Sequence, residues 1–139
     1  MNRLMVPVTA ALLAVALVGA AACNNESEYP PTSEKEDLAR LQAMEAEIDT
    51  LVGDAACEKD EDCRAIAFGD KPCGGPWSYK VYSVTSVDTL EVARLVAAYN
   101  KFNELLNQKH GWMSDCMVVS EPRVGMIAGR CEAIRERTE

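Results

Sequence analysis

Residues 88–108 read DTLEVARLVAAYNKFNELLNQ, and this stretch decides the helical part of the fold. That spacing predicts an amphipathic helix over about 88–108, because apolar residues recur every three or four positions. A capping box marks its start, with Asp88 three residues before Glu91, and Gly111 marks its end. The apolar positions are Val92, Leu95, Val96, Tyr99, Phe102 and Leu106.

A second helix is predicted upstream, over about 34–52. Ser33 and Glu36 form another capping-box pattern, and Gly53 is a natural stop. Its apolar face must pack against the rest of the domain or against another chain. The residues on that face are Leu38, Leu41, Met44, Ile48, Leu51 and Val52.

Short segments rich in β-branched and aromatic residues, bounded by turn-forming residues, predict strands. They are residues 64–68, 77–84 and 117–119, followed by a terminal hairpin of 123–127 and 130–134. Together with the helices they predict an α+β fold: a small antiparallel sheet with two packed amphipathic helices, stabilised by disulfides.

The first 22 residues have the pattern of an export signal. Arg3 supplies a positive start, residues 4–22 are almost entirely apolar, and small residues lead into Cys23. This segment resembles a bacterial lipoprotein signal with its lipobox, and the resemblance implies that Cys23 carries the lipid, palmitate included. Ala20 stands where the lipobox has leucine, so a retained membrane anchor and a secreted protein remain alternatives.

Residues 23–33 predict a lipidated cysteine and a flexible tether, because they are polar and contain a Pro-Pro pair. A single α+β domain is expected over 34–139. Asn24 follows the cysteine, and in the lipoprotein sorting rule the absence of aspartate there favours the outer membrane. The expected location is therefore the bacterial cell envelope, on the periplasmic side, with the membrane contacted through the N-terminal lipid.

The acidic composition excludes one class of partner. The chain of 139 residues has a formal net charge of -8, and its pI is near 4.7. Nucleic acid is not expected as a partner, because phosphate binding needs a basic face. A protein partner with basic residues suits this charge better.

Beyond Cys23 the chain has five cysteines: Cys57, Cys63, Cys73, Cys116 and Cys131. In an oxidising compartment all five are disulfide candidates. Because the number is odd, at least one thiol is free or paired between molecules, and the connectivity stays open. No metal is expected, since the chain has no Cys-x-x-Cys pair and a single histidine.

Several motifs resemble a group of small, uncharacterised bacterial lipoproteins. They are CEKDEDC at 57–63, GDKPCGGPWSYKVYS at 69–83, YN at 99–100, SDC at 114–116 and GRC at 129–131. In that group a further cysteine stands near the position of Met126. The resemblance implies that its loss here leaves an old partner unpaired. It supports the fold and the location, and it implies no activity.

Two clusters have residue types that occur in catalytic or metal-binding sites. His110, Ser114 and Asp115 are too close in sequence to converge as a hydrolase triad, so His110 is expected at a helix C-terminus. The acidic run Asp60–Asp62 lacks the spacing of a calcium loop, so a solvated loop is expected. No catalytic residue and no cofactor are predicted.

The stretch CGGPW at 73–77 is the most unusual local sequence. It predicts a disulfide-pinned turn with Trp77 in the core, or a rigid loop that offers Trp77 and Tyr79 to a partner. The leading hypothesis is a non-enzymatic protein-binding lipoprotein with an inhibitor, immunity or envelope-assembly role. The alternative is a periplasmic hydrolase or thiol-redox enzyme.

Overall fold

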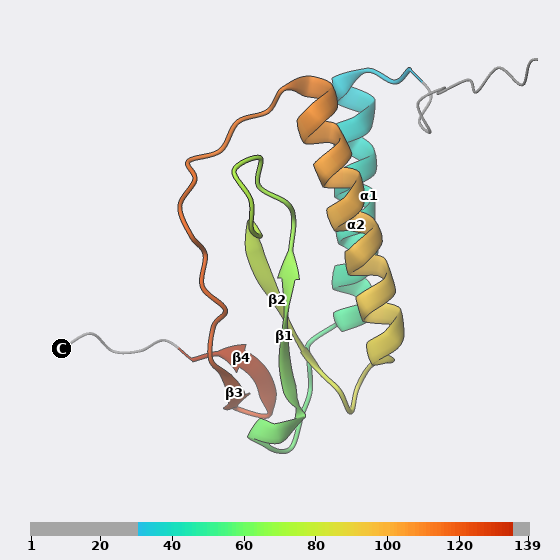
Figure 1. Cartoon of the computed structure of the whole chain (residues 1–139). Helices are drawn as coiled ribbons and strands as arrows, with labels where there is room; N and C mark the ends of the chain where they lie inside the picture. The colour runs from blue at the N-terminus through green and yellow to red at the C-terminus, as the bar shows by residue number, and fades with distance from the viewer. Residues whose placement is uncertain (1–30, 135–139) are drawn as a thin grey trace, which may run out of the picture. The chain divides into compact units, whose positions relative to one another are not determined.

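A computed structural model describes residues 31–134. The predicted signal segment, Cys23 and most of the tether lie outside the described residues. Two helices and two small antiparallel sheets confirm the α+β class (Figure 1). The elements are α1 (Glu34–Val52), η1 (Asp60–Asp62), β1 (Cys63–Phe68), β2 (Ser78–Ser83), α2 (Thr89–His110), β3 (Val124–Ile127) and β4 (Arg130–Ala133).

Both predicted N-cap residues cap their helices, but the reciprocal capping box forms only at α1, because the Glu91 carboxylate of α2 binds Arg94 instead. Ser33 and Glu36 form a reciprocal capping box before α1, and Gly53 follows its last turn with a positive φ. The Asp88 carboxylate accepts from the backbone N–H groups of Leu90 and Glu91 at the start of α2. In the described part of the chain, neither helix is long and apolar enough to cross a membrane.

The helices cover one face of the β1–β2 hairpin (Figure 1). Side chains alternate across a strand, so Ile66 and Phe68 of β1 and Tyr82 of β2 share the face that meets the helices. Phe68 stacks on Tyr99 of α2, with ring centroids 4.1 Å apart. The main core contains Ile48, Phe68, Val92, Val96 and Tyr99.

An ion pair ties the hairpin to α1 at the edge of this core. Lys80 of β2 donates to Glu45 at 3.0 Å and to Asp49 at 2.6 Å. Its ammonium also lies 4.5 Å from the centre of the Phe68 ring. The ammonium therefore makes a cation–π contact with a core ring while it pairs with the carboxylates of α1.

The predicted single sheet is divided into two. β1 pairs with β2, and β3 pairs with β4, as separate two-stranded antiparallel sheets. The segment before β1 adds a bridge between Ala56 and Arg130. A second apolar cluster of Ala55, Cys63 and Cys131 fills the junction.

The strand predicted at residues 117–119 is wrong. This segment belongs to the long connection from α2 to β3, which has no secondary structure (Figure 1). The carbonyl of Met117 accepts from the Lys71 ammonium at 2.9 Å instead of from a neighbouring strand. β-branched residues favour extended backbone, but a strand also needs a ladder partner.

A buried carboxylate joins the start of α1 to the end of α2. Asp37 is only 3% exposed. It accepts hydrogen bonds from Lys109 at 2.6 Å and from His110 Nε2 at 2.8 Å, as well as from Thr32. The Lys109 ammonium, with Thr32, holds the pKa of Asp37 well below its usual range. His110 thus lies at the helix C-terminus, as predicted.

We predict that Asp37→Asn lowers the melting temperature at neutral pH. A carboxyl whose pKa is lower in the folded state stabilises the fold above its unfolded pKa, about 4, and loses this effect as pH falls below it. The difference in melting temperature between the wild type and Asp37→Asn should therefore become smaller as the pH falls below about 4. Thermal unfolding followed by circular dichroism measures it.

The matched control is Glu47→Gln, which changes an exposed carboxylate on the same helix. Its melting temperature should follow the wild-type curve closely. If the melting temperatures of the wild type and Asp37→Asn differ by the same amount from neutral to strongly acidic pH, the ionised carboxylate does not have the stabilising role assigned to it.

Candidate functional site

The candidate site is formed by two loops, residues 69–77 and 112–118, called here the clamped loops. A disulfide between Cys73 and Cys116 joins them. The backbone N–H of Cys73 also donates to the Ser114 hydroxyl at 3.4 Å. On the chain-entropy model, closing a loop of 43 residues stabilises the fold by about 4 kcal/mol.

Lys71 is the second link between the clamped loops. Its side chain is 4% exposed, and its ammonium donates to Asp115 Oδ1 and to the Met117 carbonyl, each at 2.9 Å. The same ammonium lies 5.1 Å from the centre of the Trp77 ring. Hydrogen bonding to Lys71 lowers the pKa of Asp115. A buried lysine with a carboxylate, a carbonyl and an aromatic face around it is well compensated.

A stripe of asparagines on α2 anchors the first clamped loop and the end of β1. Asn100 Oδ1 accepts from the Gly69 N–H at 2.7 Å, and Asn103 Oδ1 accepts from the Asp70 N–H at 2.8 Å. Asn107 Nδ2 donates to the Asp70 carbonyl at 2.8 Å. These contacts satisfy backbone groups that a loop packed on a helix would otherwise bury unpaired.

The second clamped loop presents apolar side chains to solvent. Met113 is 88% exposed, Met117 68% and Val118 90%. Their backbone is held close to Cys116, so these side chains project from a fixed segment. Exposed apolar side chains on a fixed backbone are suited to binding, because little conformational freedom is lost on contact.

The two predicted partner-binding residues have different environments. Trp77 is 43% exposed, and its ring lies against Gly69, so it is neither fully in the core nor free of it. Tyr79 is half-buried and alternates with Lys80, which places it on the face of β2 away from the helices. The Lys71 ammonium contacts both the Trp77 ring and the Met117 carbonyl, so Trp77 and Met117 lie close together. Tyr79 is not part of this group of contacts.

A polar cleft of about 320 Å³ lies between the first clamped loop and α2. Asp70 and Glu104 supply carboxylates to its lining, and Asn107 and Gln108 supply amides. The lysine in its wall, Lys71, is already paired with Asp115. Glu104 is paired in the same way with Lys101, at 2.8 Å. Asp70, which accepts from Asn107 Nδ2 at 3.2 Å, is therefore the carboxylate that the cleft offers to a positively charged group.

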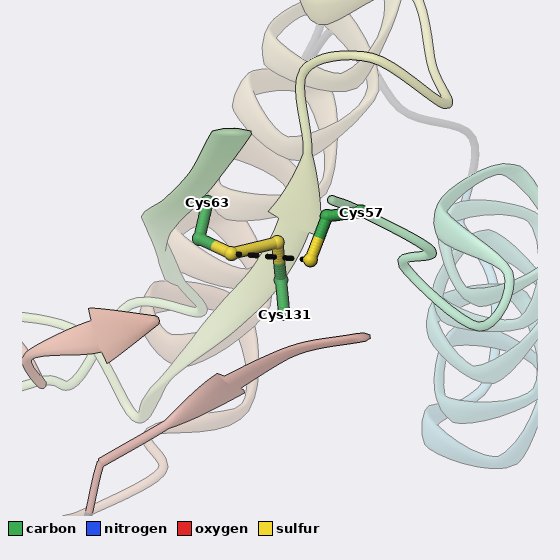
Figure 2. A group of neighbouring side chains, drawn as sticks. All are labelled: Cys57, Cys63 and Cys131. Atoms are coloured by element: carbon green, nitrogen blue, oxygen red, sulfur yellow. Dashed lines mark hydrogen bonds between the residues drawn. A yellow bond between two sulfur atoms is a disulfide. The ribbon is translucent and has the colours of Figure 1, made fainter. Parts of the chain in front are cut away.

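The five cysteine candidates form two disulfides, Cys63–Cys131 and Cys73–Cys116, while Cys57 keeps a free thiol. Figure 2 shows that the Cys57 sulfur points toward the Cys63–Cys131 bond. The Sγ atoms of Cys57 and Cys63 are 3.7 Å apart, and all three sulfurs lie within 4.8 Å of one another. Three thiolates at this spacing are a possible soft-metal ligand set, but the disulfide uses two of them.

The three residues that the sequence analysis judged too close together for a hydrolase triad, His110, Ser114 and Asp115, each have a different partner. His110 bonds Asp37, Asp115 bonds Lys71, and Ser114 accepts from the loop backbone. The acidic run has a structural role that the sequence did not indicate. Asp60 Oδ1 accepts from the Met126 N–H at 2.7 Å, and Asp62 is buried, so the expected solvated loop is wrong for Asp62.

Sequence reasoning missed Lys71 and the exposed residues of the second clamped loop. A lysine in a turn reads as a solvated charge, and only the fold shows that it is buried. The asparagine stripe did leave a signal, because Asn100, Asn103 and Asn107 recur at helical spacing beside the apolar face. Met117 and Val118 were assigned to a strand, which concealed their exposure.

Comparison of the chain with protein-family models, with curated protein sequences and with solved structures finds no significant match.

We predict that Gly69→Ala destabilises the protein more than Gly74→Ala. Both glycines have a positive φ, and this strain alone costs about 1 kcal/mol in alanine. At Gly69 an added Cβ also lies 2.7 Å from Trp77 Cδ1, whereas at Gly74 nothing lies within 4 Å. The clash adds a further cost of about 1–3 kcal/mol. Urea unfolding followed by circular dichroism measures both.

Combining Gly69→Ala with Trp77→Ala should remove the steric part of the cost. The double variant is then more stable than the sum of the single changes predicts. Equal losses of unfolding free energy for Gly69→Ala and Gly74→Ala would show that the Trp77 ring does not need the space left by the absent Cβ of Gly69.

Proposed function

We propose that this chain is a lipid-anchored protein of the bacterial envelope that binds another protein through the clamped loops. The observation that carries this proposal is the exposure of Met113, Met117 and Val118 on a backbone fixed by a disulfide and by Lys71. A non-enzymatic role as an inhibitor, immunity protein or envelope-assembly factor fits such a surface. The outer membrane is the favoured location.

The chemistry of the surface favours a basic protein as the partner. Met113, Met117 and Val118 offer apolar contact area, and methionine side chains adapt well to the shape of a partner. The cleft beside the first clamped loop offers Asp70 to a lysine or arginine, since Glu104 is already paired with Lys101. The net charge of -8 adds long-range attraction for a positively charged protein.

The alternative thiol-redox role meets a chemical obstacle at Cys57. Burial, with the carboxylates of Asp62 and Asp60, raises the pKa of this thiol. Redox enzymes instead use thiols whose pKa is lowered, because the thiolate is the nucleophile. The neighbouring disulfide is also buried, since Cys63 and Cys131 are 3% and 5% exposed. These features favour a binding role over turnover of thiol substrates.

We predict that Val118→Glu abolishes binding of the partner. The change places a charge beside the exposed apolar side chain of Met117 without touching the core, because Val118 is 90% exposed. Immobilised wild-type and variant domains are exposed to native envelope extract, and retained proteins are identified by mass spectrometry. The candidate partner is then purified and titrated by calorimetry, with affinity falling as salt is raised.

Leu90→Glu is the matched control. Leu90 is 79% exposed and lies near the start of α2, about 20 Å along the helix from the cleft residue Glu104. It should bind the partner as wild type does. If Val118→Glu and Leu90→Glu bind a purified candidate equally well, the clamped loops are not the binding surface.

We predict that Cys23→Ser releases the protein from the membrane. Once the apolar segment 4–22 has been removed, the acylated Cys23 is the proposed anchor, and several acyl chains bind a membrane far more strongly than one. Labelled palmitate should enter the wild type and not the variant, and fractionation should move the variant to the soluble periplasm. Palmitate incorporation into the variant, or a wild-type protein found in the soluble fraction, would contradict the proposed lipid anchor. Neither result would bear on the binding surface, which the Val118→Glu variant tests separately.

A further inference from the structure

The free thiol of Cys57 lies in contact with a disulfide rather than alone. Its sulfur is 3.7 Å from Cys63 Sγ, and the Cys131 sulfur is within 4.8 Å (Figure 2). Cys57 also lines an open cleft of about 680 Å³, together with Glu58, Lys59 and Thr85 among others. Cys57 can therefore be reached from solvent while the disulfide is buried.

Backbone pairing brings the three cysteines together. The Cys57 N–H donates to the Gly129 carbonyl at 3.0 Å, and the Cys131 N–H donates to the Ala55 carbonyl at 2.9 Å. The segment before β1 thus lies along β4, on the edge that β3 does not use. This arrangement exists only after the β3–β4 hairpin has docked.

We propose that Cys57 is an internal thiol–disulfide exchange residue, which pairs first with Cys63 and is displaced by Cys131 as the β3–β4 hairpin docks. In the first step a small-molecule disulfide oxidises the thiols of Cys57 and Cys63 and leaves as two thiols. In the second step the Cys131 thiolate attacks Cys63 Sγ. The Cys57–Cys63 bond breaks, the Cys63–Cys131 bond forms, and Cys57 leaves as a thiolate that takes up a proton.

Loop length sets this order. Cys57 and Cys63 are six residues apart, whereas Cys63 and Cys131 are 68 apart. In an unfolded chain the entropy of loop closure favours the shorter pair roughly 40-fold. The folded structure reverses the preference by placing Cys131 against Cys63, so docking of the hairpin drives the exchange forward.

The surroundings of Cys57 oppose the reverse step. Burial and the carboxylates of Asp62 and Asp60 raise the pKa of the released thiol, so it stays protonated at neutral pH. A protonated thiol does not attack a disulfide. Cys57 therefore leaves the native disulfide intact once the exchange is complete.

The test is oxidative refolding of the full chain with Cys23 replaced by serine, so that only the five described cysteines take part. Reduced protein is refolded with glutathione and its disulfide, quenched with acid, alkylated with N-ethylmaleimide and mapped by peptide mass spectrometry. The Cys57–Cys63 pair is expected early and should decline as Cys63–Cys131 appears. In Cys57→Ser the native pair should form more slowly, because glutathione must then oxidise Cys63 itself, which is 3% exposed once the hairpin has docked.

Cys131→Ser provides a second measurement, since it removes the displacing thiol. This variant should retain the Cys57–Cys63 pair at the end of the reaction, whether or not its hairpin docks. An unchanged rate of native pairing in Cys57→Ser would overturn the proposal. So would an absence of the Cys57–Cys63 pair in both the early wild-type samples and Cys131→Ser.

Discussion

The polar contact between α2 and the end of the β1–β2 hairpin is the constraint on which the clamped loops depend. Asn100, Asn103 and Asn107 bind backbone groups of residues 67–70, which lie against the helix. Apolar packing alone would bury these peptide groups without partners, at a cost of about 1–3 kcal/mol each. The asparagine stripe therefore sets the position of the turn that carries Lys71 and Cys73. Through these two residues the turn holds the second clamped loop, residues 112–118.

The two disulfides lie at opposite ends of the hairpin and have different surroundings. Cys63–Cys131, at the beginning of β1, is buried in a small apolar cluster and joins the two sheets. Cys73–Cys116, in the turn, is exposed and joins two loops. Both cross-links stabilise the fold by restricting the unfolded chain, in addition to the packing of the core. Only the exposed one also fixes a surface that other molecules can reach.

Local signals in the sequence were enough for the helices and for most strands. Apolar periodicity and capping residues place α1 and α2 to within about two residues of their bounds, because a helix is stabilised by its own neighbours. The segment 117–119 failed because a strand depends on a partner elsewhere in the chain. Cysteine connectivity and the burial of Lys71 are equally non-local. The candidate site consists mainly of such contacts, so only Trp77 and the cysteines could be identified beforehand.

The free thiol and the clamped loops have different proposed roles. Cys57 has a raised pKa and a buried disulfide beside it, which suit a single exchange during folding and not repeated reaction with outside thiols. The clamped loops are already fixed and carry apolar side chains into solvent beside an acidic cleft. Stability normally favours burying such side chains. The backbone that carries them is held by a disulfide and by the buried Lys71. We therefore propose that these side chains contact a second protein.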